Sequence, residues 1–217
     1  MPGDAVSSLK NASWTVARWL SVGWLAIWLH RKSELRRCGW FRSFRAAASI
    51  DRRGDSIPWF TYGAIEFLRR CDLSEVRVFE YGAGASTTWF AKRAKEVISV
   101  EHDPRWARLA ASVAGTKVVV RPPGSEYIHE IEAHGVFDLV IVDGLDRREC
   151  ALAAMGCLSR HGAIVWDNSD RIEFLETVNE LDAAGFRSLP FSGLAPITFV
   201  GSETTFLYRS GANCLGI

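Results

Sequence analysis

Acidic and glycine residues stand at a spacing that suits ligand binding in segment 76–86, VRVFEYGAGAS. Its first four residues have the pattern of a short buried strand, and Glu80 ends this run. Gly82 and Gly84 follow, and because glycine has no Cβ, the backbone here can approach a ligand closely. The hydroxyl of Ser86 stands where a helix would begin. The segment therefore predicts a ligand-binding turn between a strand and a helix.

A second acid, Glu101, stands 21 residues after Glu80, at the end of another strand-like run, 97–100. An acid at the tip of the second strand can accept hydrogen bonds from ribose hydroxyls, so the two acids indicate a nucleoside site. A dinucleotide site would have a glycine or alanine where this chain has Thr87. Glu80 would also repel a pyrophosphate, whereas it suits a cationic ligand.

These residues resemble the class I S-adenosylmethionine-dependent methyltransferases, whose first motif, E/D-x-G-x-G, matches Glu80-Tyr81-Gly82-Ala83-Gly84. The family's second-strand acid matches Glu101, and the resemblance covers residues 66–208. It implies S-adenosyl-L-methionine as the cofactor, with Glu80 near its methionine part and Glu101 on its ribose. His102 would then lie beside the adenine, or else be an exposed loop histidine. The implied cofactor-binding residues are Glu80, Tyr81, Gly82, Gly84, Ser86, Glu101, His102 and Asp143. Ser125 and Glu126 follow the third strand, where the family often contacts adenine.

Three more polar residues end apolar segments, Asp143 in FDLVIVDG and Asp167 with Asn168 in GAIVWDN. Catechol-type O-methyltransferases hold a magnesium ion with an Asp and an Asp-Asn pair at such positions, and oxygen ligands suit Mg²⁺. By this resemblance all three are candidate magnesium ligands, and Asp143 is the candidate catalytic residue, as base or metal ligand. Alternatively, Asp143 meets the cofactor amino group, while the Asp-Asn pair caps the next helix.

Four further residues could contribute to a site or have a purely structural role. Arg147 and Arg148 could orient an anionic substrate, but solvated arginines at a helix start are the favoured interpretation. Trp59 ends the entry turn 57–59, and Tyr62 belongs to the predicted helix 60–70 that follows it, which helps cover the cofactor in the resembled family. Their rings either line a pocket or pack beneath that helix.

The elements that must position these residues alternate along the chain. Strand-like runs at 76–79, 97–100, 117–121, 137–142 and 162–166 are separated by helical patterns, which predicts a parallel sheet covered by helices. Segments 186–191 and 204–208 have no helix between them, which indicates a closing antiparallel hairpin. The expected fold is therefore α/β, with the Rossmann-like seven-stranded sheet of the resembled family. The helical patterns lie at 87–95, 104–114, about 125–133, 146–158 and 171–184.

Composition limits the number of domains, the partners and the cellular setting that we expect. The 217 residues, 48% of them hydrophobic, suit one domain with an extension, and the net charge of +1 argues against nucleic acid as a partner. The chain also lacks the Asn-Pro-Pro-Tyr motif of base and amide N-methyltransferases. Five scattered cysteines without a CxxC pair indicate reduced thiols in a cytoplasmic setting.

Residues 1–56 form the predicted extension, before a methyltransferase domain at 57–217. Segment 14–29 holds four of the nine tryptophans, but its uninterrupted apolar part is 11 residues, short of the ~20 needed to span a bilayer. Eight Lys or Arg and two acids follow between Arg31 and Arg53. Segment 14–53 therefore predicts peripheral contact with an anionic surface, at the inner face of a membrane. The alternatives are an uncleaved signal anchor, and a helix that packs on the domain or on a second subunit in a homodimer.

The residues favour an S-adenosylmethionine-dependent methyltransferase that is O-directed, acting on a small molecule or a membrane-associated glycan or lipid-linked acceptor. The second hypothesis is a non-catalytic, nucleoside-binding scaffold protein of the same fold. A nicotinamide oxidoreductase is disfavoured by Thr87 and the closing hairpin.

Overall fold

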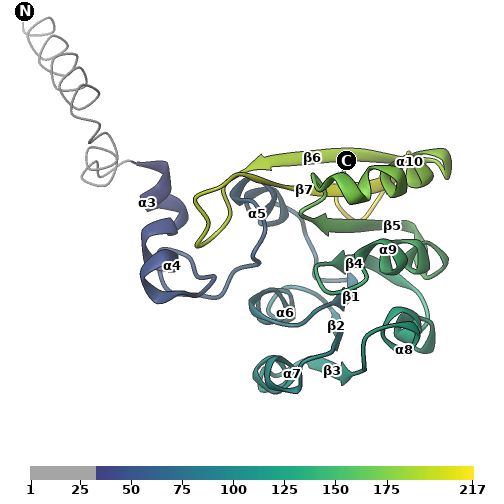
Figure 1. Cartoon of the computed structure of the whole chain (residues 1–217), viewed down its shortest axis with the longest axis horizontal. Helices are drawn as coiled ribbons and strands as arrows, with labels where there is room; N and C mark the ends of the chain where they lie inside the picture. Colours follow the sequence, from purple (N-terminus) through teal and green to yellow (C-terminus); the bar gives the residue numbers. More distant parts are fainter. Residues whose placement is uncertain (1–32) are drawn as a thin grey trace, which may run out of the picture.

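A computed structural model describes residues 33–217 of the chain. Its centre is a seven-stranded sheet in the order β3-β2-β1-β4-β5-β7-β6 (Figure 1). The first five strands are parallel, and β7 runs antiparallel between β5 and β6. The sheet confirms the predicted α/β fold with its closing hairpin. The strands are β1 Arg77–Tyr81, β2 Glu96–Glu101, β3 Thr116–Val120, β4 Phe137–Val142, β5 Leu158–Asp167, β6 Phe186–Gly193 and β7 Ser202–Arg209.

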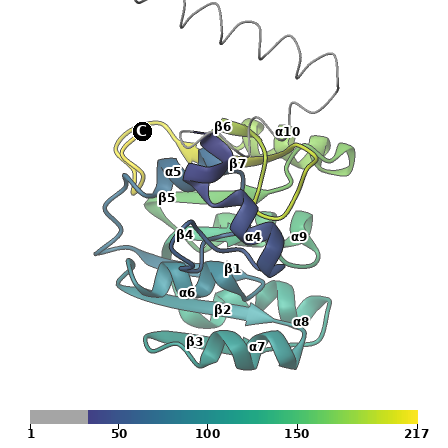
Figure 2. The same ribbon diagram turned by 90° about the vertical axis from the view of Figure 1, so that its left-hand side faces the viewer.

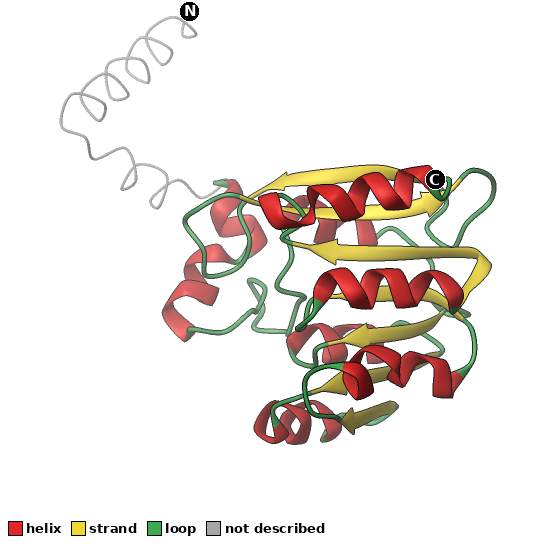
Figure 3. Ribbon diagram, turned by 45° about the vertical axis from the view of Figure 1, so that its right-hand side comes forward, coloured by secondary structure: helices red, strands yellow, loops and turns green. Residues whose placement is uncertain are grey.

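Helices cover both faces of the sheet, as the alternating pattern predicts (Figures 1 and 3). One buried apolar cluster packs α8, α9 and α10 on one face, and a second packs α5 and α6 on the other. Figure 2 views the side on which α4, α6 and α7 lie in front of the strands. The helices are α3 Glu34–Cys38, α4 Trp40–Ala46, α5 Tyr62–Leu68, α6 Ala85–Ala91, α7 Pro104–Ala111, α8 Ser125–Ile128, α9 Arg147–Gly156 and α10 Leu175–Ala183.

Two expected helices contain 3₁₀ turns. Segment 125–133 divides into α8 and η1 His129–His134, and segment 171–184 begins as η2 Ile172–Phe174 before α10. In η1, the buried carboxylate of Glu130 lies 2.7 Å from Arg121 Nε and 2.8 Å from His134 Nε2. Gly135, at φ 82°, ends this turn with a backbone conformation that favours glycine. A buried ion-pair cluster therefore accompanies the tightened turn.

The segment before the predicted domain boundary contacts the loop between β6 and β7 and the residues that lead into α5. Trp40 Nε1 donates to the Thr198 carbonyl at 2.5 Å, and Ser49 Oγ donates to the Ile57 carbonyl at 2.8 Å. Among residues 33–217, no helix has both the length and the apolar character that crossing a bilayer requires. Of the predicted membrane-contact segment 14–53, residues 14–32 lie outside the described residues.

Candidate functional site

The glycine turn after β1 uses its two glycines for different reasons. Gly82 has φ 94°, and a Cβ there would lie 3.2 Å from the Asp143 carbonyl oxygen. Gly84 has an extended backbone, at φ −180°, and a Cβ there would meet no protein atom within 4 Å. The tertiary structure therefore requires glycine at position 82, whereas position 84 leaves space that a ligand can use.

Glu80 is buried beneath this turn, with 1% of its surface exposed. Its Oε2 accepts hydrogen bonds from Thr87 Oγ1 at 2.5 Å and Ser99 Oγ at 2.7 Å. Its other oxygen, Oε1, has no hydrogen-bond partner within the described part of the chain. Burial raises the pKa of Glu80 to about 7, against the hydrogen bonds from Thr87 and Ser99, which lower it. An unpartnered buried carboxylate oxygen is costly, so this atom points to a cationic or proton-donating ligand.

Glu101, at the end of β2, organises the same turn. Its Oε2 accepts the Ala83 N–H at 2.8 Å, and Oε1 accepts the N–H groups of His102 and Asp103, each at 2.8 Å. The Nδ1 atom of His102 also lies 2.8 Å from Oε1. Because each carboxylate oxygen can accept two hydrogen bonds, Oε2 keeps one site for a ligand hydroxyl.

A pocket of about 460 Å³ opens over these residues. It holds the predicted residues Glu80, Gly82, Gly84, Ser86, Glu101, His102 and Asp143 together. Tyr81 is the exception, because its ring is fully buried in the core and its hydroxyl donates to the Ile128 carbonyl at 2.7 Å. Ser125 and Glu126 are exposed on α8 and do not belong to the lining of this pocket.

Sequence reasoning missed several residues of the lining. Trp106 of α7 lies on the rim with 52% of its surface exposed, and Ala47 to Ile50 contribute from the N-terminal segment. Trp106 stands on the polar side of an amphipathic helix. A tryptophan at such a position is a sequence signal that could have indicated ligand contact. Ile197 has φ 71°, which is rare for a β-branched residue, and no local motif predicts that it reaches this pocket.

A second pocket, of about 500 Å³, adjoins the first, because Trp59 and Asp143 line both. Its polar side consists of Asp143, Arg147, Asp167 and Asn168, and loop residues between β6 and β7 form the rest. Trp59 therefore lines a pocket, as one interpretation of the sequence expected. Tyr62 instead packs against the apolar cluster around α5 and α6.

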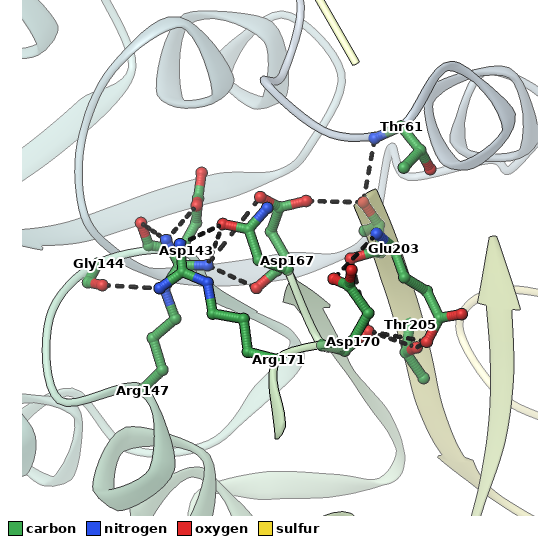
Figure 4. A network of polar contacts seen from close by, with 12 residues as sticks. Thr61, Asp143, Gly144, Arg147, Asp167, Asp170, Arg171, Glu203 and Thr205 are labelled. Atoms are coloured by element: carbon green, nitrogen blue, oxygen red, sulfur yellow. Dashed lines mark hydrogen bonds and ion pairs between the residues drawn. The ribbon is translucent and has the colours of Figure 1, made fainter. Parts of the chain in front are cut away.

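The interpretation of Arg147 as a solvated arginine at a helix start is wrong. Its side chain is only 13% exposed, so it is not a solvated arginine, whereas Arg148 is 42% exposed and donates to Glu180 Oε1 at 2.8 Å. Figure 4 shows the Arg147 guanidinium beside Asp143 and Asp167. Its Nη2 donates to Asp143 Oδ1 at 3.0 Å, and its Nη1 lies 4.0 Å from Asp167 Oδ2.

The predicted magnesium site does not fit this geometry. A guanidinium lies among the three expected ligands, Asp143, Asp167 and Asn168. Asp167 Oδ1 also accepts a hydrogen bond from Thr204 Oγ1 at 2.7 Å. Within residues 33–217, no group of three or more His, Cys, Asp or Glu side chains could hold a metal ion. The alternative helix-cap role is not seen either, because Arg171 and Phe174 flank the helix starts without a side-chain cap.

The two aspartates share one electrostatic environment. Desolvation raises the pKa of Asp143, the Asp167 charge raises it further, and Arg147 acts in the opposite direction. Desolvation also raises the pKa of Asp167 to about 6, against its hydrogen bond with Thr204 and the Arg147 charge. A carboxylate whose pKa is raised at the junction of two pockets can accept a proton near neutral pH.

Comparison with known proteins supports the fold. No protein-family model matches the chain, and no curated protein matches it significantly. Among solved structures, an S-adenosylmethionine-dependent O-methyltransferase from Thermotoga maritima is similar, with a TM-score of 0.54 and 16% identity, over 69% of this chain and 65% of that one. An rRNA methylase from Streptococcus thermophilus has a TM-score of 0.51 and 16% identity, over 66% and 92% of the two chains.

A precorrin-6y C5,15-methyltransferase from Geobacter metallireducens is also similar, with a TM-score of 0.50 and 14% identity, over 66% of this chain and 85% of that one. Together with the strand order, these similarities show that the chain has the class I methyltransferase fold. At such low identities they carry no information about its substrate.

Proposed function

We propose that the protein is an S-adenosylmethionine-dependent methyltransferase that methylates a hydroxyl group of its acceptor. The observation that carries the proposal is the pair of adjoining pockets that meet at Asp143 and Trp59. One pocket has the residues expected of a nucleoside site, and the other has room for an acceptor. Methyl transfer requires two such pockets, because the donor and acceptor must be aligned on either side of the transferred group.

The first pocket suits S-adenosylmethionine in three places. The unpartnered Oε1 of Glu80 can receive the positively charged methionine part, and Gly84 leaves space beside it. The remaining acceptor site on Glu101 Oε2 can bind a ribose hydroxyl. His102 and Trp106 line the same pocket and provide ring surfaces for adenine.

S-adenosylmethionine, when bound, supplies an electrophilic methyl group on a sulfonium. The chain then has to orient the acceptor and remove its proton. Arg147 holds Oδ1 of Asp143, and within the described residues the other oxygen, Oδ2, makes no hydrogen bond. This oxygen is therefore available to accept the hydroxyl proton, and Trp59 can hold the apolar part of an acceptor. Asp143 is the catalytic residue in this proposal.

The sharpest test of the cofactor pocket is Gly84→Ala, because the added methyl group meets only the empty pocket. Calorimetry with S-adenosylhomocysteine should show about 10-fold or weaker binding, with no change in thermal stability. Gly156→Ala is the matched control, because its Cβ also meets no atom within 4 Å but Gly156 lies outside the pocket. Equal affinity in both variants would contradict the assignment of the pocket.

The same titrations should include S-adenosylmethionine, NAD and Glu101→Ala. Binding of the two adenosyl ligands, lost in Glu101→Ala, would support the proposal, whereas binding of NAD would overturn it. Because Glu101 also holds three backbone N–H groups, the thermal stability of this variant must be measured beside its affinity. Tight binding without turnover on a panel of hydroxylated acceptors would favour the non-catalytic scaffold.

We further propose that the acceptor is presented at an anionic membrane surface. A hollow at α3 and α4 is lined by Arg36, Phe41, Arg42 and Arg45. Arg42 Nη1 donates to the Arg52 carbonyl at 3.0 Å, which joins this hollow to a second one. The second hollow brings Arg69, Lys92 and Arg93 beside Arg52 and Arg53, with Asp51 and Asp55 as its only acids. Arg36, Arg42, Arg45, Arg52 and Arg53 belong to the predicted membrane-contact segment 14–53, and the basic residues of both hollows suit anionic headgroups.

Vesicle flotation tests this second proposal. Arg42→Glu with Arg45→Glu should reduce binding to phosphatidylglycerol vesicles, and phosphatidylcholine vesicles should bind neither protein. Arg160→Glu is the control, because Arg160 is exposed near the start of β5 and lies outside both basic hollows. Unchanged flotation of the double variant would contradict membrane presentation while leaving the cofactor site untouched.

A further inference from the structure

The five N–H groups of Arg147 are all used inside the cluster of acids. Nε donates to the Gly144 carbonyl at 3.0 Å, and Nη1 donates to the Asp167 carbonyl at 2.5 Å and to Asn168 Oδ1 at 3.1 Å. Nη2 donates to the carbonyl of Asp143 at 3.3 Å and to its Oδ1 at 3.0 Å. A guanidinium has five donors, so none remains for a ligand. Arg147 therefore holds the protein together here and does not bind substrate directly.

The position of Arg147 in α9 argues for the same role. It is the first residue of that helix, where the helix dipole disfavours a cation. The preceding residue, Asp146, has φ 46°, so the backbone turns sharply just before the helix. Helix stability does not explain an arginine at this place. Its contacts with the two strand ends after β4 and β5 do.

A second arginine, Arg171, adds positive charge beside the cluster. Arg171 Nη2 donates to Asn168 Oδ1 at 3.1 Å from the solvent side, with its side chain 51% exposed. Figure 4 shows Arg147 and Arg171 converging on the Asp143 and Asp167 side chains. Arg171 also lies 3.8 Å from Glu173 Oε1, so the cation that lies between the two aspartates is Arg147, in the place that a divalent ion would take.

We propose that Arg147, supported by Arg171, is a built-in cation that takes the place of a divalent metal ion at the acceptor pocket. Its guanidinium occupies the space between the would-be ligands, so the site binds no catalytic metal. Arg147 is also a positioning residue, because it holds one oxygen of Asp143 and leaves the other toward the acceptor. The positioning role rests on the proposed methyltransferase function, whereas the exclusion of a metal does not.

Titration of the EDTA-treated protein with Mn²⁺ and Mg²⁺ tests the exclusion. Calorimetry should show no saturable binding to the wild-type protein, and neither ion should raise its thermal stability. Arg171→Ala alone is the matched control and should behave in the same way. Arg147→Ala in the Arg171→Ala background vacates both guanidinium positions, and this variant should bind one Mn²⁺ that raises its thermal stability.

Two outcomes would overturn the exclusion. One is saturable binding of Mn²⁺ or Mg²⁺ by the wild-type protein at this pocket, seen as binding that is lost in Asp167→Asn. The other is a folded double variant that binds no Mn²⁺. If the double variant does not fold, the wild-type titration decides alone, and saturable binding there overturns the proposal. Affinity for S-adenosylhomocysteine, measured on the same samples, reports on the proposed function separately.

Arg147→Lys tests the positioning role. Lysine keeps the charge but loses the planar fork that holds Asp143, Asp167 and Asn168 together. We expect kcat to fall about 100-fold while KM for S-adenosylmethionine stays within a few-fold, because only the base is misplaced. A kcat equal to that of the wild-type protein would overturn the positioning role, and so would an equal loss in Arg171→Ala.

Discussion

The protein holds two pairs of acids at the strand ends of one sheet, and it treats them differently. Glu80 and Glu101 are held by neutral donors, namely side-chain hydroxyls and backbone N–H groups. Asp143 pairs with the guanidinium of Arg147, which also lies 4.0 Å from Asp167 Oδ2, while the other oxygen of Asp167 accepts a hydrogen bond from Thr204. The first pair leaves an acceptor site on each carboxylate for a ligand, whereas the second pair faces a cation that the protein itself supplies. Acids at equivalent strand ends therefore take their function from their partners.

The largest expected effect tests the catalytic role of Asp143, the aspartate that Arg147 holds. Asp143→Asn should lower kcat by about 10² to 10⁴, because the amide cannot accept the acceptor's proton. Binding of S-adenosylhomocysteine should change only a few-fold, since the other residues of that pocket remain. Steady-state kinetics and calorimetry measure the two quantities. Asp146→Asn is the control, because asparagine tolerates the left-handed conformation at that position. Wild-type turnover by Asp143→Asn would contradict the role of Asp143 as the proton acceptor, and with it the functional difference between the two pairs of acids.

The pH dependence of stability tests Glu80, the member of the first pair that hydroxyl groups hold. The pKa of Glu80 is about 7 in the folded protein and has an ordinary value of 4.5, so the folded state retains a proton that the unfolded state releases. Stability should therefore fall as pH rises from 4.5 to 7 and level off above 7, by about 3 kcal/mol at most from this group. Thermal unfolding of Glu80→Gln across this range should show a smaller fall.

Glu176→Gln is the comparison for that experiment, because Glu176 is an exposed acid on α10. It should follow the wild-type curve. If Glu80→Gln also follows it, the Glu80 carboxylate is not held protonated by burial, and the contrast between the two pairs becomes weaker.

Thr87→Val tests the hydroxyl that holds Glu80. The variant removes a buried donor to a carboxylate and the acceptor of the Gly84 N–H, so the free energy of unfolding should fall by about 1–3 kcal/mol. Thr177→Val is a close control, because Thr177 is equally buried but its hydroxyl has no partner among the described residues. Denaturant unfolding of both variants should separate them. Equal losses would mean that the hydroxyl of Thr87 contributes nothing beyond its volume.

The smallest expected effect concerns the rim of the cofactor pocket. Trp106→Ala should weaken binding of S-adenosylhomocysteine about 3- to 10-fold, because it removes ring surface beside the nucleoside. Thermal stability should not change, since Trp106 is half exposed. Leu109→Ala on the same helix is exposed and outside the pocket, so its affinity should remain at the wild-type value. A loss shared by both variants would assign the effect to α7 as a whole.

Local patterns predicted most of the fold and most of the first pocket. The apolar runs ending in acids predicted the strands, and the glycine turn with Glu101 predicted a site that the structure assembles. The prediction that Tyr81 binds the cofactor did not anticipate its buried ring. Its motif position does not determine where the ring points, and the alternation of side chains along the strand directs it into the core. Trp106 was missed because an exposed tryptophan has no motif of its own.

The order of apolar runs and acids along the chain places these groups at the strand ends, because alternating strands and helices bring those ends to one edge of the sheet. What each acid faces depends on the packing of the strands and helices. Asp143 and Asp167 become neighbours through the pairing of β4 with β5, and Arg147 reaches both across that pairing. No local pattern encodes which cation fills the space between two strand ends. Whether a metal ion or a guanidinium sits there depends on contacts between residues far apart in the chain.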